Sequence, residues 1–179
     1  MEAAYNDALT FTRAQEGGWY DGKDPRDPNP TMYGVTQKTY DAYRDGKKLT
    51  RRSVRDIDPV ELGDIYRGYW TDAACDKLPP ITAACVFDMS INAGPAAAVK
   101  CLQRALGVEV DGKFGQRTAD ALRGSFALAA SDADKRLADR VCYARLRYYL
   151  DIATARPNLR PNMLPWTRRV LEFRERFLA

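Results

Sequence analysis

Apolar residues recur every three or four positions along most of the chain, which predicts a mainly α-helical protein. In the first such run the apolar positions are Tyr5, Leu9 and Phe11 or Thr12. Glu16 lies at the last turn of this expected helix, and Gly17 and Gly18 favour a helix end directly after it. We therefore expect an amphipathic N-terminal helix with its apolar face turned inward.

Two further helices are indicated by their capping residues. Thr36 can cap a helix that ends near Gly46. Asp58 is a good N-cap for the next helix, because Pro59 takes the first helical position and Glu61 follows. The apolar positions of that helix are Leu62, Ile65, Tyr66, Tyr69 and Trp70. Local signals thus predict where both helices begin.

The stretch from Ala83 to Ile91 is almost uniformly apolar, so we expect it to form the central buried helix. Asp88 lies inside this stretch, and a buried carboxylate requires a partner. Asn92 and the residues up to Pro95 end the helix, and the Asn92 amide could there contact an acetamido group of a substrate. A structural Asn that caps a turn is the alternative.

Glu16 is the first candidate for chemistry. The carbonyl end of a helix carries partial negative charge, and Trp19 and Tyr20 supply apolar surface beside the carboxyl group. Both effects favour the protonated carboxyl form, which a general acid needs near neutral pH. An ordinary helix end with Glu16 in solvent is the alternative.

The loop that follows supplies possible partners for this acid. Its acidic residues are Asp21, Asp24 and Asp27, and Pro25, Pro28 and Pro30 stiffen the backbone around them. Glycoside hydrolysis uses two carboxyl groups about 5 to 10 Å apart, on opposite sides of a sugar bond. A stiff loop can place one Asp at such a distance from Glu16. For any single Asp, a turn in which the side chain bonds its own backbone is the alternative.

This stretch resembles the signature of glycoside hydrolase family 108, a group of phage-type and secretion-associated N-acetylmuramidases. The family pattern is approximately EGGY, DPxDPGG and TxYGIT, and the matching segments are Glu16–Trp19, Asp24–Pro28, Thr31 and Tyr33–Gln37. The resemblance implies that Glu16 is the catalytic acid, with Asp27 and Thr31 as the other catalytic residues. Because about two extra residues precede DPRDP and Asn29-Pro30 replaces a glycine pair, Asp24 stays open as the second carboxylate.

The resemblance also suggests residues that bind substrate, namely Asp24, Tyr33, Trp70 and Asn92. The family has a similar IYRxxYW pattern around Trp70, and aromatic rings can stack on sugar faces. Its FDxxVNxG pattern faces the cleft and corresponds to the segment that contains Asn92. A core position for Trp70, at helical spacing from Tyr66, is the alternative.

Histidine is absent from the sequence, which restricts the possible chemistry. Ser-His and Cys-His nucleophiles lack their base, and a His-ligated zinc site is impossible. Zinc amidases, zinc endopeptidases and Cys-His peptidases are therefore disfavoured, and we expect no metal and no cofactor. The four cysteines form no CxxC pair and are expected to be free thiols: Cys75, Cys85, Cys101 and Cys142.

The segment Leu102–Leu122 resembles a common peptidoglycan-binding motif, with the form LQxxLG followed by DGxFGxxT. It predicts a helix, a tight turn at Asp111-Gly112, a bend at Gly115 and a second helix. We expect residues 1–90 to form the glycoside hydrolase region. Residues 91–179 would form a helical, peptidoglycan-binding-like region packed into the same globular unit.

The C-terminal third is cationic. From Lys135 onward eleven Lys and Arg accompany four Asp and Glu, although the whole chain carries only +4. The residues expected to form a basic face on two helices are Arg136, Arg140, Arg147, Arg168, Arg169, Arg174 and Arg176. Such a face would attract the polyanionic bacterial envelope, whereas an ordinary solvated helix surface is the alternative. Trp166 is expected to anchor the final helix.

The sequence predicts no membrane span and no secretory signal, because it has no run of 18 apolar residues and residues 1–15 lack an apolar core. We therefore expect synthesis in the cytoplasm and action in the periplasm or cell wall after release through another protein. No recognisable nucleic-acid motif is present, so nucleic acid is not an expected partner. A monomer is expected.

These observations together predict a mainly α, lysozyme-like domain with a small irregular or β lobe near the active-site loop. The expected activity is hydrolysis of the β-1,4 bond between N-acetylmuramic acid and N-acetylglucosamine in peptidoglycan. Glu16 would donate the proton, Asp27 would stabilise the positive charge or orient water, and Thr31 would hold that water. A lytic transglycosylase and a non-catalytic wall-binding protein are the alternatives.

Overall fold

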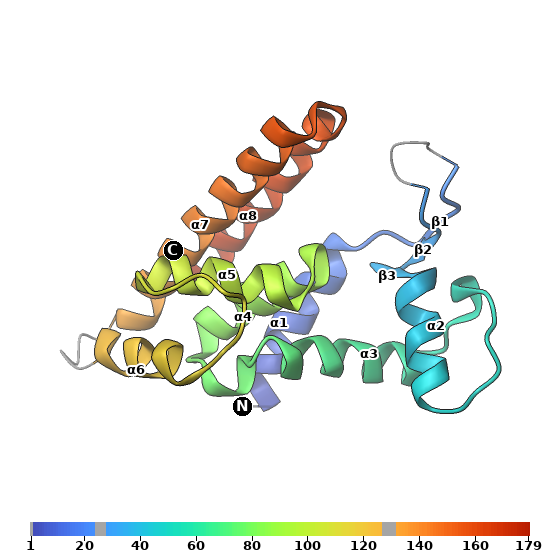
Figure 1. Cartoon of the computed structure of the whole chain (residues 1–179), viewed down its shortest axis with the longest axis horizontal. Helices are drawn as coiled ribbons and strands as arrows, with labels where there is room; N and C mark the ends of the chain where they lie inside the picture. Colours follow the sequence, from blue (N-terminus) through green and yellow to red (C-terminus); the bar gives the residue numbers. More distant parts are fainter. Residues whose placement is uncertain (1, 24–27, 127–131) are drawn as a thin grey trace.

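The computed structural model describes residues 2–23, 28–126 and 132–179, which form a mainly helical protein (Figure 1). The α-helices are α1 (Glu2–Gln15), α2 (Gln37–Gly46), α3 (Pro59–Asp72), α4 (Pro80–Ala93), α5 (Pro95–Leu106), α6 (Gln116–Ser125), α7 (Ala133–Ala155) and α8 (Met163–Leu178). Three short strands, β1 (Trp19–Tyr20), β2 (Thr31–Met32) and β3 (Val35–Thr36), form an antiparallel sheet in that order. The predicted class, a lysozyme-like helical domain with a small β lobe, is confirmed.

The helical body is built around α4, in which all residues from Thr82 to Ile91 are buried. This helix packs against α1, α5 and α7, which explains why its sequence is apolar on every side. Its first N–H groups are capped by another helix. The carboxylate of Asp134 on α7 accepts hydrogen bonds from the backbone N–H groups of Ile81 and Thr82, both at 2.8 Å. The predicted central buried helix is confirmed.

Asp88 of α4 is fully buried and has the partners that its burial requires. Its carboxylate accepts hydrogen bonds from Arg145 at 2.7 Å, from Arg169 at 2.7 Å and from Thr12 at 3.1 Å. Burial raises the pKa of Asp88, but the guanidinium groups of Arg169 and Arg145 outweigh this effect and hold the pKa below its usual range. A single charge therefore joins α1, α4, α7 and α8.

A second polar network joins α2 to α3 beside the sheet. Glu61 forms the predicted capping box with Asp58 at the start of α3. The same carboxylate accepts a hydrogen bond from Tyr40 and forms ion pairs with Arg44 and Arg52. Burial raises the pKa of Glu61, but the hydrogen bonds from Tyr40 and Arg52 outweigh this effect and lower the pKa to about 2. The network fixes the orientation of the helices that carry the small lobe.

The peptidoglycan-binding-like segment forms α5 and α6, joined by a loop that Gln103 holds in place. The Gln103 amide donates to Asp111 at 2.7 Å and accepts from the backbone N–H of Gly112 at 2.8 Å. Gly112 has a φ of 78°, and an added Cβ would lie 3.1 Å from the carbonyl oxygen of Ala96. Several residues that make the motif recognisable therefore serve to build this loop.

The α7–α8 hairpin projects from the helical body, and its tip contains a 3-10 segment, η3 (Pro157–Asn162) (Figure 1). Trp166 stacks on Tyr149 with ring centroids 4.9 Å apart, in agreement with the predicted anchor of the final helix. The four cysteines are buried free thiols, as expected. Within the described ranges, no helix combines the length and apolar character that crossing a membrane requires.

The basic face predicted on α7 and α8 is smaller than expected. Arg169 is only 7% exposed, because it points into the helical body rather than into solvent. Three other positions pair with carboxylates on the surface: Arg136 with Asp132, Arg147 with Asp151, and Arg174 with Asp139. A count of charges along the sequence therefore overestimates the free positive charge of this hairpin.

Candidate active site

Glu16 directly follows α1, which ends at Gln15 and so is one residue shorter than predicted. Its side chain is only 13% exposed, and its Oε1 lies 2.7 Å from Nη1 of Arg169. The contact is an ion pair whose angle falls short of hydrogen-bond geometry, so Oε1 is buried without a hydrogen bond from the described residues. The alternative of a solvated Glu16 is therefore wrong, and a guanidinium group that the sequence did not indicate lies beside the carboxylate.

The turn between β2 and β3 approaches the Glu16 carboxylate closely. Gly34 in this turn has a φ of 73°, and an added Cβ would lie 2.6 Å from Oε2 of Glu16. Tyr33 before it has a φ of 51°, a conformation that side chains other than glycine rarely adopt. A strained turn without a side chain at Gly34 is therefore what allows the backbone to approach the carboxylate so closely.

Tyr66 of α3 holds this turn in place. Its hydroxyl donates a 2.6 Å hydrogen bond to the carbonyl oxygen of Tyr33. Burial raises the pKa of Tyr66, and the negative charge of Glu16 adds to the effect, so the phenol remains protonated and able to donate. The small lobe is thus attached to the helical body next to Glu16.

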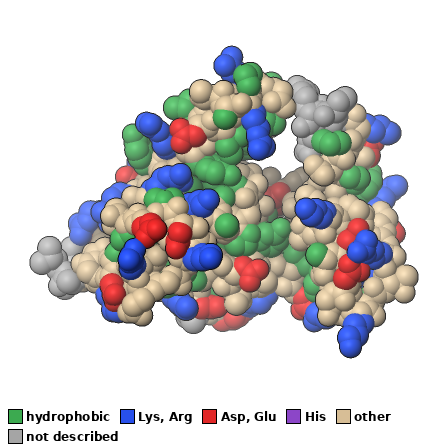
Figure 2. All heavy atoms as spheres, viewed as in Figure 1, with side chains coloured by type: hydrophobic (Ala, Val, Ile, Leu, Met, Phe, Trp, Pro, Cys, Tyr) green, Lys and Arg blue, Asp and Glu red, His purple; other side chains and the backbone are tan. Residues whose placement is uncertain are grey.

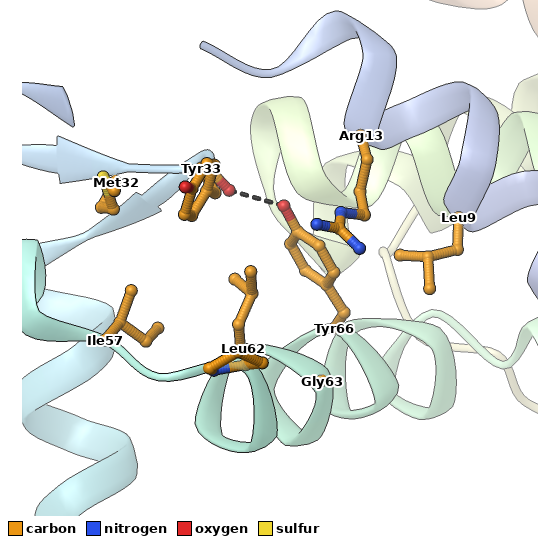
Figure 3. A pocket seen from close by; sticks show the side chains of 9 residues that line it. Leu9, Arg13, Met32, Tyr33, Ile57, Leu62, Gly63 and Tyr66 are labelled. Carbon is orange, nitrogen blue, oxygen red and sulfur yellow. Dashed lines mark hydrogen bonds between the residues drawn. The ribbon is translucent and has the colours of Figure 1, made fainter. Parts of the chain in front are cut away.

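A cavity of about 340 Å³ opens between the small lobe, α1 and α3. Figure 3 shows Tyr33 and Tyr66 joined by their hydrogen bond at its centre, with the Arg13 side chain directed toward Tyr66. The remaining lining residues are mainly apolar: Leu9, Met32, Ile57, Pro59, Leu62 and Gly63. An apolar wall with a few polar groups is typical of a site that binds a small molecule.

A second cavity, also of about 340 Å³, involves the tip of the α7–α8 hairpin. Its lining residues are Gln15, Asn92, Asn162, Pro165, Trp166, Arg168 and Arg169. Residues that contact Glu16 line both cavities: Arg13, whose carbonyl oxygen accepts a hydrogen bond from the Glu16 backbone N–H, lines the first, and the ion-pair partner Arg169 lines the second. Figure 2 shows the surface hollowed between the hairpin tip and the part that carries the sheet and α2, with an acidic side chain deep in the hollow.

Both parts of the chain are similar to known proteins. One family model, described as Glycosyl hydrolase 108, matches residues 9–94, and another, described as Predicted Peptidoglycan domain, matches residues 97–178. A solved structure, "Structure of Brucella abortus SagA", is 32% identical, has a TM-score of 0.81 and aligns over 100% of this chain and 96% of that chain. The chain belongs to glycosyl hydrolase family 108. The comparison with curated proteins gave no match.

Membership of family 108, together with the peptidoglycan domain, makes this protein a glycoside hydrolase that acts on peptidoglycan. The family resemblance inferred from the segment around Glu16 is therefore confirmed. The two matched regions meet near residue 95, and the site contains residues from both of them. Glu16 lies in the first matched region, whereas its partner Arg169 lies in the second.

The second carboxylate of this family 108 enzyme stays a prediction. Asp24 and Asp27 both lie outside the described residues. Asp21, the first acidic residue of the loop, forms a 2.8 Å ion pair with Lys23 and accepts a hydrogen bond from the Lys23 backbone. This is the self-bonded turn expected as the alternative for a single Asp.

The other predicted residues of the family 108 site occupy different places. Thr31 lies in β2, where its hydroxyl donates to the carbonyl oxygen of Asn29 at 3.0 Å, and no contact within the described ranges joins it to Glu16. Tyr33 lines the first cavity and Asn92 lines the second. The structure thus places two of the predicted substrate-binding residues in cavities that neighbours of Glu16 also line.

Trp70 requires a correction. It is only 1% exposed, its indole N–H donates to Asp76 at 2.7 Å, and its ring packs edge-on against Tyr5. Trp70 therefore belongs to the core of the family 108 fold and does not line a sugar cleft. Tyr66 lies one helical turn before Trp70 on the same face and is equally buried, but its side chain also lines the first cavity, a difference that helical spacing cannot show.

Gly34 and Arg169 are residues of the family 108 site whose roles the sequence pattern does not indicate. Gly34 lies inside a segment that matches the family pattern, but its role depends on a contact with Glu16 that spacing cannot show. Arg169 lies in a run of basic residues, a pattern that predicts a surface position. Among the residues the structure describes, no group of three or more metal-binding side chains occurs.

Proposed function

We propose that this protein is an N-acetylmuramidase, which hydrolyses the β-1,4 bond between N-acetylmuramic acid and N-acetylglucosamine. The observation that carries the proposal is the place of Glu16. Its largely buried carboxylate is held between the β2–β3 turn and Arg169, and residues adjoining it line two sugar-sized cavities. This arrangement fits an acid that acts on a bond between two neighbouring sugar rings.

In the proposed reaction Glu16 gives its proton to the glycosidic oxygen while the bond from that oxygen to the anomeric carbon breaks. The leaving sugar takes up the proton, and positive charge develops on the anomeric carbon. Water then supplies the new hydroxyl group at that carbon, and its remaining proton passes to the Glu16 carboxylate or to the second carboxylate, so that the enzyme regains the proton it gave up. The Arg169 guanidinium, 2.7 Å from the Glu16 carboxylate, stabilises the negative charge that remains after proton transfer.

The second acidic group in the proposal is Asp27, with Asp24 as the other candidate. It would be ionised and would stabilise the developing positive charge or orient the attacking water. Thr31 would help to hold that water, because its hydroxyl oxygen can still accept a hydrogen bond while the hydroxyl donates to Asn29. Whether the product keeps or inverts its configuration depends on the separation of the two carboxyl groups.

The identity of the cleaved bond is tested by the products formed from purified sacculi. After borohydride reduction, a muramidase yields fragments that end in reduced N-acetylmuramic acid, which mass spectrometry identifies. Fragments ending in reduced N-acetylglucosamine would overturn the proposed bond. Fragments with a 1,6-anhydro ring would instead support a lytic transglycosylase.

We also propose that the protein acts on the cell wall outside the inner membrane, since its substrate lies there. The positive charge that remains exposed on the α7–α8 hairpin would assist the approach to an anionic envelope. This contribution is expected to weaken as salt concentration rises, because exposed charges are screened.

A further inference from the structure

The cavity at the tip of the α7–α8 hairpin differs in chemistry from the one under the small lobe. The first cavity is mainly apolar, whereas this one contains amide, indole and guanidinium groups on three elements around Glu16. Its lining residues come from the end of α1, the end of α4 and the segment from Asn162 to Arg169. Two cavities of such different character fit two different sugars of one strand.

Asn92 is oriented so that its NH2 group can donate a hydrogen bond to a ligand. The hydroxyl of Tyr149 donates to Oδ1 of Asn92 at 2.8 Å, which fixes the amide plane. Within the part of the chain that the structure describes, no hydrogen bond uses Nδ2 of Asn92. A donor held at a cavity wall is complementary to the carbonyl oxygen of an acetamido group.

Trp166 supplies an aromatic wall to the same cavity. One face of its ring stacks on Tyr149, with an interplanar angle of 21° and centroids 4.9 Å apart. The ring is half-buried and also lines the cavity, so part of its surface is available to a ligand. A rigid ring beside an amide donor suits the apolar face of an N-acetylated sugar.

Arg168 and Arg169 are neighbours with different roles. Arg169 is largely buried and is occupied by Asp88 and Glu16. Arg168 is exposed, lines the cavity and forms no ion pair with any of the described residues. A free guanidinium binds a carboxylate through two parallel hydrogen bonds. The cavity therefore presents a group for an anion in addition to the groups that suit a sugar.

Of the two sugars in peptidoglycan, only N-acetylmuramic acid bears a lactyl group and, through it, a peptide with free carboxylates. We propose that this cavity binds the N-acetylmuramic acid unit and that Arg168 binds a carboxylate of its attached peptide. The inference rests on the proposed muramidase activity and adds a preference for glycan strands that still carry peptides. Asn92 and Trp166 would contact the sugar itself.

The test compares two substrates: soluble glycan strands with their peptides, and the same strands after the peptide carboxylates have been converted to neutral amides. Wild-type protein should show a higher kcat/KM on the strands with free carboxylates. Arg168→Ala should lower kcat/KM on those strands about ten- to a hundredfold, as expected when a charge-assisted hydrogen bond is lost, and should change cleavage of the amidated strands far less. Arg168→Lys keeps the charge but not the two parallel hydrogen bonds, so its kcat/KM should fall less than that of Arg168→Ala.

Arg160→Ala is the matched control, since Arg160 is an exposed residue of the same hairpin tip that does not line the cavity. It removes the same charge and should leave the preference unchanged. Equal loss from Arg168→Ala on both substrates, or no preference in the wild type, would overturn the inference while the muramidase proposal stands. Failure of the wild type to cleave either substrate would instead contradict the proposed function.

Discussion

Asp88→Asn should destabilise the protein strongly, because it removes the charge that two buried guanidinium groups share. Asp88 and the Arg145 side chain are 0% exposed, and Arg169 is only 7% exposed. Breaking a buried ion pair by neutralising one partner costs about 3–5 kcal/mol. For a chain of this length each kcal/mol lowers the melting temperature by about 2–4 °C, so the expected decrease is about 6–20 °C.

The pH dependence gives this prediction a definite sign. The pKa of Asp88 is held below its usual range, so the carboxylate contributes stability above its unfolded pKa of about 4 and loses it as the pH falls through the folded value. The free energy difference between wild type and Asp88→Asn should therefore be largest near pH 7 and should shrink below about pH 4. Glu61, whose pKa is lowered to about 2, contributes equally to both proteins and cancels from the difference.

Urea unfolding followed by circular dichroism, at pH values from 7 to 3, measures this difference directly. Asp120→Asn is the control, because Asp120 forms an exposed pair with Arg123 on one helix and should change stability by less than about 1 kcal/mol. A difference of less than about 1 kcal/mol for Asp88→Asn at neutral pH would refute the reasoning. So would a difference that stays constant as the carboxylate is titrated.

Two further substitutions test the surroundings of Glu16. Gly34→Ala should reduce the rate at which the protein releases soluble fragments from sacculi at least about tenfold, because the added Cβ would lie 2.6 Å from the Glu16 carboxylate. Gly18→Ala is the control, since an added Cβ there meets open space and should have little effect on this rate. Arg169→Met should lower kcat on soluble glycan strands about ten- to a hundredfold with a smaller change in KM, since it removes the guanidinium beside Glu16. Arg169→Lys should recover part of that loss, and equal activity of the two Arg169 variants would speak against a role of the charge.

Features that depend on neighbouring residues were predictable from the sequence. The caps of α2 and α3 involve side chains within three residues of the backbone groups they bind. The burial of α4 followed from its apolar composition, and the need of Asp88 for a partner followed from that burial. The segment around Glu16 also indicated the family, because its residue types are specific.

Features that depend on tertiary contacts were not predictable in this way. Arg145 and Arg169 lie 57 and 81 residues after Asp88, and nothing local distinguishes them from surface arginines. Trp70 and Tyr66 both lie at apolar positions of α3 and are both only 1% exposed, yet only Tyr66 lines the first cavity. Periodicity identifies the apolar residues of a helix but not the neighbour that each will contact.

The rate of glycan cleavage by Glu16→Gln tests the central claim most directly. The change keeps the size of the side chain and removes the proton that the mechanism requires. Purified wild type, Glu16→Gln and the control Glu109→Gln, an exposed residue paired with Arg117, would be compared on the same sacculi once their melting temperatures have been measured. Glu16→Gln should be slower by about a hundred- to ten-thousandfold, with Glu109→Gln unchanged. A folded Glu16→Gln protein that retains more than a tenth of the wild-type rate would contradict the assignment of Glu16 as the catalytic acid.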